Sequence, residues 1–143
     1  MKIELKKIKH SAALSQETNA YSAEIWVDSV KRGTVQNQGF GGPDDVQPTT
    51  LAMEIIEYAK TLPHINCFGK DLPQSLETVL GGTLDRHLGE KRLKRLLSTK
   101  TVFIEDGKCY SSKSRPGNLK EGSIVLNDLS LTDALELFLK IEA

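Results

Sequence analysis

Apolar and polar residues alternate along the first third of the chain, and this alternation predicts extended strands. It is clearest in residues 20–28, where one face of an extended chain is apolar and the other carries polar side chains and a tryptophan. The apolar face consists of Tyr21, Ala23, Ile25 and Val27, and the opposite face of Ser22, Glu24, Trp26 and Asp28. Residues 2–9 alternate more weakly, and a polar turn after residue 28 leads to a third strand through residues 34–36. Together these segments predict an antiparallel β meander.

From residue 51 onward, apolar residues recur at the spacing of a helix instead of alternating with polar ones. A helix over residues 51–62 would have one apolar stripe, made of Leu51, Ile55, Ala59 and Leu62. Thr49 or Thr50 is expected to cap its N-terminus, and Pro63 is expected to end it.

Two more helices are predicted over residues 74–88 and 90–98, because leucines recur there at helical spacing. The pair Gly81-Gly82 lies inside the first of them and costs about 1 kcal/mol per glycine, which predicts a close backbone approach or a break. His87 falls on the apolar stripe, so we expect a buried histidine with a hydrogen bond.

A two-residue hairpin is the clearest local signal in the second half. Residues 101–105 and 108–111 flank Asp106-Gly107, the sequence typical of a type I′ turn. In that register Phe103 lies opposite Tyr110, and Ile104 lies opposite Cys109.

A short strand over residues 124–126 and a C-terminal helix complete the chain. Ser130 is expected to open this helix, and its inward face would carry Leu131, Ala134, Leu135 and Phe138. The order of meander, helical segment, hairpin and helix predicts an α+β fold, and we expect a single domain over residues 1–143.

Length and charge narrow the functional classes. The 143 residues suit one domain, and 19 basic residues balance 19 acidic ones, so no net field directs the chain to nucleic acid. The two cysteines, Cys67 and Cys109, are too few for a disulfide framework. No segment approaches the roughly 20 apolar residues of a membrane span. We therefore expect a cytoplasmic protein without a membrane partner.

The stretch Asn37-Gln38-Gly39-Phe40-Gly41-Gly42-Pro43 is the most unusual in the chain. Three glycines in four positions let the backbone reach positive φ and let main-chain N–H groups converge on an anion. Phe40 would then stack on a ring. The stretch matches neither the Walker motif nor the dinucleotide fingerprint. A tight connection between a strand and a helix explains the same glycines without a ligand.

Four stretches, residues 17–23, 33–42, 58–63 and 102–110, together resemble small uncharacterised proteins encoded by phages and prophages. In those proteins the loop often reads Asn-x-Gly-His-Gly-Gly, and Phe40 stands here in place of the histidine. The resemblance implies a phage context, in which small accessory proteins bind and neutralise a component of the host cell.

The leading hypothesis is a non-catalytic protein that binds and sequesters a small phosphorylated or nucleotide-like ligand, such as a host immune signalling nucleotide. The loop would hold the anion and the ring through Asn37, Gly39, Phe40, Gly41 and Gly42. Four arginines would neutralise phosphate: Arg86, Arg92, Arg95 and Arg115. A solvated helix surface explains the basic residues near position 92 equally well. Lys6, Lys7, Lys9 and His10 form a weaker basic cluster, which protection of an edge strand also explains.

Two alternatives belong to other classes. Trp26, on the polar face of its strand, suggests an interface with a host protein or with a second copy of the chain. Asp44 and Asp45 suggest a small metal-dependent hydrolase or nuclease. His64 and Cys67 are spaced as half a zinc site but have no second half. We assign no catalytic residue, metal ligand or cofactor.

Overall fold

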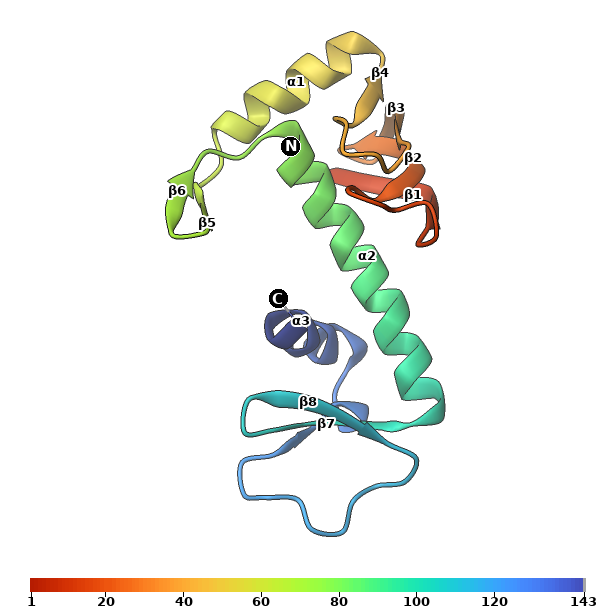
Figure 1. The fold of residues 1–143 in the computed structure, drawn as a ribbon, viewed down its shortest axis with the longest axis vertical. Coiled ribbons are helices and arrows are strands. Elements are labelled where there is room, and N and C mark those ends of the chain that lie inside the picture. The colour runs from red at the N-terminus through yellow and green to blue at the C-terminus, as the bar shows by residue number, and fades with distance from the viewer. Residues whose placement is uncertain (143) are drawn as a thin grey trace. The chain divides into compact units, whose positions relative to one another are not determined.

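The computed structural model describes residues 1–142, which form an α+β fold, as predicted (Figure 1). Its contacts divide into two compact units, Met1–Leu84 and Asp85–Ala143, and each is described by itself. No helix in residues 1–142 combines the length and apolarity needed to cross a membrane.

The first unit contains the predicted antiparallel meander, extended by one strand. Strands β1 (Ile3–Ser11), β2 (Ala20–Val27), β3 (Val30–Asn37) and β4 (Asp45–Gln47) follow one another in a four-stranded sheet. Each pairs antiparallel with the next. The short β4 had no alternation to reveal it, because three residues are too few to show a period.

The two faces of β2 differ as the alternation predicts. Tyr21, Ala23, Ile25 and Val27 are buried, whereas Ser22, Glu24 and Trp26 are only partly covered. After β4, at the edge of the sheet, the chain continues into helix α1 (Thr49–Lys60), whose Leu51, Ile55 and Ala59 are buried.

Helix α1 begins without a side-chain cap, so the prediction that Thr49 or Thr50 caps it is wrong. Both threonines already lie in the helix, and Pro48 occupies the capping position. The Pro48 carbonyl accepts bonds from the amides of Leu51 and Ala52 at 3.0 and 3.3 Å. The Thr61 hydroxyl donates to the Tyr58 carbonyl at 2.7 Å, and the helix ends before Pro63, as expected.

A second hairpin, which the sequence pattern did not predict, follows α1. Strands β5 (Ile65–Cys67) and β6 (Lys70–Leu72) pair across Phe68 and Gly69, which both have positive φ (52° and 78°). The Phe68 side chain at the tip is fully exposed.

One continuous helix, α2 (Leu76–Thr99), replaces the two helices predicted between residues 74 and 98. Gly81 and Gly82 neither break it nor approach another backbone, since an added Cβ at either would meet no atom within 4 Å. His87 is exposed, which corrects the expectation of a buried histidine. The buried Leu80 and Leu84 on either side of the glycines offset their helix-breaking cost.

The second unit holds the predicted hairpin in the predicted register. Strands β7 (Thr101–Glu105) and β8 (Lys108–Ser112) pair Phe103 with Tyr110 and Ile104 with Cys109. Asp106 and Gly107 have φ of 52° and 74°, as a type I′ turn requires. The chain continues through β9 (Ile124–Val125), the 3-10 turn η1 (Leu126–Asp128) and helix α3 (Leu131–Glu142). The sheet order is β8-β7-β9.

One hydrophobic cluster joins these elements to the second part of α2. Its buried members are Leu93, Val102, Ile104, Leu126, Ala134, Leu135 and Phe138. The Ser130 hydroxyl accepts the Asp133 amide at 3.2 Å, which confirms it as the cap of α3. Leu131 is 38% exposed, so its predicted inward position is wrong, because it lies in the first turn, ahead of the packed stripe.

Replacing Gly82 with alanine should stabilise α2, because the new methyl group has open space and alanine is the better helix former. We expect the free energy of unfolding in urea to rise by about 1 kcal/mol. Gly33→Ala is the contrasting variant, since its Cβ would lie 2.1 Å from the Gln47 carbonyl oxygen and 2.7 Å from Leu51 Cδ2. It should lose about 2 kcal/mol or more. A less stable Gly82→Ala protein would contradict the open surroundings of this glycine.

Candidate functional site

The glycine-rich loop after β3 needs glycine at two positions. Gly39 and Gly41 have φ of 90° and 94°, which side chains other than glycine rarely adopt. A Cβ at Gly39 would also lie 2.3 Å from the Leu14 carbonyl oxygen. Gly39 is therefore fixed by both conformation and space.

The glycine-rich loop is tied to the loop between β1 and β2. The Gly39 carbonyl accepts the amides of Gln16 and Glu17 at 3.0 Å each, and that of Thr18 at 3.4 Å. The two loops thus form one hydrogen-bonded structure at the end of the sheet.

The side chain of Asn37 holds the loop from within. Its Oδ1 accepts the Thr18 hydroxyl at 2.8 Å and the Gly39 amide at 2.9 Å. Its Nδ2 donates to the Gly42 carbonyl at 3.1 Å and to Asp44 Oδ1 at 3.0 Å. Both lone pairs and both protons of the carboxamide are used. Asn37 therefore has a structural role that the sequence pattern did not reveal.

Two loop amides are engaged inside the loop. The Gly39 amide bonds to Asn37, and the Gly41 amide donates to the Thr18 hydroxyl at 3.3 Å. An anion at the loop would have to displace these bonds, so other groups must supply most of its binding.

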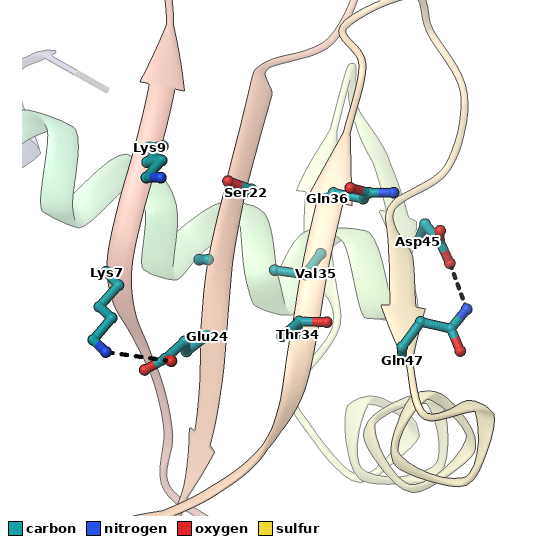
Figure 2. Close-up of a pocket in the computed structure, with 10 residues that line it drawn as sticks. Lys7, Lys9, Ser22, Glu24, Thr34, Val35, Gln36, Asp45 and Gln47 are labelled. Atoms are coloured by element: carbon teal, nitrogen blue, oxygen red, sulfur yellow. Dashed lines mark hydrogen bonds and ion pairs between the residues drawn. The ribbon is translucent and has the colours of Figure 1, made fainter.

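Polar side chains form rows across the face of the sheet that bears Ser22 and Glu24, called here the open face. Figure 2 shows Lys9, Ser22, Gln36 and Asp45 in line across the four strands, as their pairing dictates. They border a shallow pocket of about 450 Å³. The row is positive at its β1 end and negative at its β4 end.

Lys9 differs from the neighbouring Lys6, Lys7 and Lys31, because it has no partner among the described residues. Glu24 binds Lys31 at 2.8 Å and Lys7 at 3.8 Å, and the hydrogen bond from Lys31 lowers the pKa of Glu24. Lys6 lies over the Trp26 ring at 3.9 Å. Among the residues that the structure describes, Lys9 has neither a carboxylate nor a ring beside it, so its charge is available to a ligand.

A second pocket, of about 460 Å³, lies where β1 and β3 end and β2 begins, and we call it the Phe40 pocket. Its apolar rim consists of Phe40 and Leu14, which are 61% and 58% exposed. Lys9 and His10 contribute basic groups, and Ser22, Gln36 and Gln38 contribute polar ones. His10 Nε2 lies 3.1 Å from Asn19 Oδ1, which orients its ring.

A third pocket, of about 220 Å³, contains the acidic groups Asp44 and Glu77, and we call it the acidic pocket. Burial raises the pKa of Asp44 above its ordinary value of 3.8, and the charge of Glu77 raises it further. The hydrogen bond from Asn37 and the nearby Tyr21 hydroxyl act in the opposite direction and lower it. Burial and then the charge of Asp44 raise the pKa of Tyr21. Asp45 lines the pocket of the open face instead, so the two aspartates do not face a common metal position.

The four arginines predicted to neutralise phosphate all lie in the second unit, whereas the loop lies in the first. Arg86 pairs with Glu136 at 2.6 Å, and Arg115 donates two hydrogen bonds to Asp128 at 3.1 and 2.7 Å. Arg92 lies over the Phe138 ring at 5.2 Å, and Arg95 is exposed on α2. Three of the four thus have contacts within their own unit, and their role toward a ligand stays a prediction.

Trp26 is half-buried on the open face rather than fully exposed. Its Nε1 donates to Glu24 at 3.3 Å beneath Lys6. These contacts within the chain explain why a tryptophan lies on a polar face. Trp26 is therefore weaker evidence for an interface with another protein or a second copy.

Histidine and cysteine do not gather into a metal site. In residues 1–142 no three side chains of histidine, cysteine, aspartate or glutamate are grouped to hold a metal ion. His64 Nδ1 instead lies 3.3 Å from Asp71 across the β5–β6 hairpin. Tyr21 and Glu77 are the site residues that sequence reasoning missed, and the tyrosine in the apolar stripe of β2 was the available signal.

Asn37→Ala should destabilise the first unit, since it removes four hydrogen bonds and leaves the partners in a partly buried loop. We expect a loss of about 3 kcal/mol in the free energy of unfolding, with faster hydrogen exchange at Gln16 and Glu17. Gln38→Ala, at the exposed neighbouring residue, is the control and should stay within about 0.5 kcal/mol of the wild type. Equal stability of the two variants would show that Asn37 does not hold the loop.

Asp44→Asn should stabilise the protein at neutral pH and not at low pH. The substitution keeps an oxygen that accepts the Asn37 bond but removes the charge that burial disfavours. Below the ordinary pKa of 3.8 the carboxyl is neutral in both the folded and unfolded states, so nothing is gained. As pH rises through the raised folded pKa, the wild type loses stability relative to the variant. Urea unfolding from acidic to neutral pH measures this, with Asp45→Asn as the control for losing one negative charge; a gain that is independent of pH would contradict it.

Comparisons with family models, curated proteins and solved structures find no match to this chain. The likeness to small phage proteins therefore stays a prediction, and the functional argument depends on the geometry of the chain itself.

Proposed function

We propose that this protein binds and sequesters a small nucleotide-like ligand in the Phe40 pocket. The observation that carries the proposal is an exposed aromatic ring in one pocket with a lysine that has no partner among the residues that the structure describes. The phage context and a host immune signalling nucleotide as the ligand are part of the same proposal.

The ring of the ligand is the first requirement. Phe40 and Leu14 are both more than half exposed on the rim of one pocket, and two large apolar side chains on one rim are more informative than a single exposed one. A nucleobase between them would cover both. Stacking of a base on an aromatic side chain contributes about 1–3 kcal/mol and tolerates any base.

The phosphate is the second requirement. Lys9 supplies a charge that no carboxylate among the described residues neutralises. Lys9 replaces the loop amides of Gly39 and Gly41 as the main anion-binding group, because those amides are already bonded. A lysine ammonium binds phosphate as a point charge.

The polar edge of a base is the third requirement. Gln36 and Gln38 line the same pocket, and a carboxamide offers both a donor and an acceptor. Asp45 lies outside the Phe40 pocket, in a neighbouring pocket that Gln36, Gln38 and Phe40 also line, and its carboxylate would accept from an exocyclic amino group that extends from the base. Binding without turnover is sufficient for sequestration, so this role needs no catalytic set.

A protein-binding module is the second candidate, and one observation favours it. Phe68 is completely exposed at the tip of the β5–β6 hairpin, and aromatic side chains in such positions anchor interfaces. This candidate depends on Phe68 and not on Trp26, so the two proposals are separated by variants of different residues.

Phe40→Ala and Lys9→Gln should each weaken nucleotide binding. We expect about a tenfold rise in Kd for Phe40→Ala, from lost stacking. For Lys9→Gln we expect a smaller rise and a weaker dependence of Kd on salt, because one phosphate contact is lost. Thermal shifts against a panel of mononucleotides, cyclic nucleotides and dinucleotides identify the ligand, and calorimetry gives the Kd.

Two matched controls lie on the β5–β6 hairpin. Phe68→Ala removes an equally exposed aromatic ring, and Lys70→Gln removes an exposed lysine. Both should bind the ligand as the wild type does. If no member of the panel stabilises the protein even at millimolar concentration, the proposal fails and the protein-binding module becomes the better candidate.

A further inference from the structure

The acidic pocket adjoins the Phe40 pocket, with Tyr21 and Asn37 lining both, but it differs from that pocket in chemistry. It lies on the side of the glycine-rich loop where Tyr21 and Asn37 pair across the strands, opposite the face that bears Gln36 and Ser22. Its lining residues all belong to the first unit: Thr18, Asn19, Tyr21, Asn37, Gly42, Asp44, Glu77, Gly81 and Leu84.

Negative charge in this pocket has no counterpart. In the part of the chain that the structure describes, neither Asp44 nor Glu77 has a basic side chain at ion-pair distance. The charge of Glu77 disfavours the charged form of Asp44, and the printed hydrogen bond to Asp44 comes from the neutral Asn37 amide. Two carboxylates facing one cavity without a cation are stabilised by any cation that enters.

A buried hydroxyl in the same pocket is a second, independent sign that a ligand binds there. Tyr21 is only 7% exposed, and its hydroxyl makes no hydrogen bond in residues 1–142. Asp44 is near enough for its charge to affect the phenol, but the two do not meet the geometry of a hydrogen bond. A buried polar group without a partner costs free energy, which a ligand with N–H donors would recover.

We infer that the acidic pocket binds a small organic cation with N–H donors, a primary ammonium or a guanidinium group, between Asp44, Glu77 and the Tyr21 hydroxyl. Both carboxylates accept hydrogen bonds and the Tyr21 hydroxyl can also accept one, and a charged donor forms the stronger type of hydrogen bond with a carboxylate. The pocket holds two carboxylates and no third acidic, histidine or cysteine ligand, which suits an N–H cation better than a metal ion. Its volume of about 220 Å³ admits a group of a few heavy atoms.

The test titrates the full chain with methylguanidinium chloride and ethylammonium chloride while recording amide NMR spectra. Tetramethylammonium chloride is the control probe, since it has the same charge and no N–H donor. We expect saturable shifts at the amides of Thr18, Asn19, Gly42 and Gly81 with the first two salts only. Asp44→Asn and Glu77→Gln should each weaken binding about tenfold, as expected when a hydrogen bond between charged groups is lost. Tyr21→Phe should weaken it about threefold.

Asp45→Asn is the matched control variant, because it removes the adjacent negative charge from the other side of the loop. It should bind the cations as the wild type does, and so should Phe40→Ala, which separates this inference from the nucleotide proposal. Glu77 lies in the exposed first turn of α2, so its variant tests the pocket without changing a buried group of the loop. Three results would each overturn the inference: no saturable shift, an equal response to tetramethylammonium, or unchanged affinity in Glu77→Gln.

Discussion

The saturated carboxamide of Asn37 is the constraint on which the candidate sites depend. It joins the end of β3, the loop before β2 and the start of β4 through four hydrogen bonds. Because no other side chain of that size has two donors and two acceptors, the geometry of the glycine-rich loop follows from this residue as much as from its glycines. The loop therefore acts first as a rigid partition, with the Phe40 pocket on one side and the acidic pocket on the other.

The partition separates opposite charges. Lys9 stands beside Phe40, whereas Asp44 and Glu77 stand beyond Asn37. The two proposals accordingly assign ligands of opposite sign to the two sides, an anionic one beside Phe40 and a cationic one beside Asp44.

The sequence predicted the elements that are long enough for their hydrophobic periodicity to be recognised. The alternation of β2 predicted its buried face, and Asp106-Gly107 predicted both the turn and the register of β7 and β8. Strands of three residues, such as β4 and β5, have no readable period. The continuity of α2 through Gly81-Gly82 was missed because propensity is local, whereas the burial of Leu80 and Leu84 is tertiary. Of the candidate site, the position of the loop was predicted, but the roles of Tyr21 and Glu77 depend on contacts between residues far apart in the chain.

Helix α2 also has a consequence for cooperativity. Its residues up to Leu84 belong to the first unit and those from Asp85 to the second, so its two ends are stabilised by different hydrophobic cores. The glycine pair lies just before this division, in open surroundings. Because the helix is intrinsically weakest at that point, fluctuations that fray one end need not spread to the other. Local unfolding of the first unit can therefore leave the hairpin of β7 and β8 and helix α3 folded.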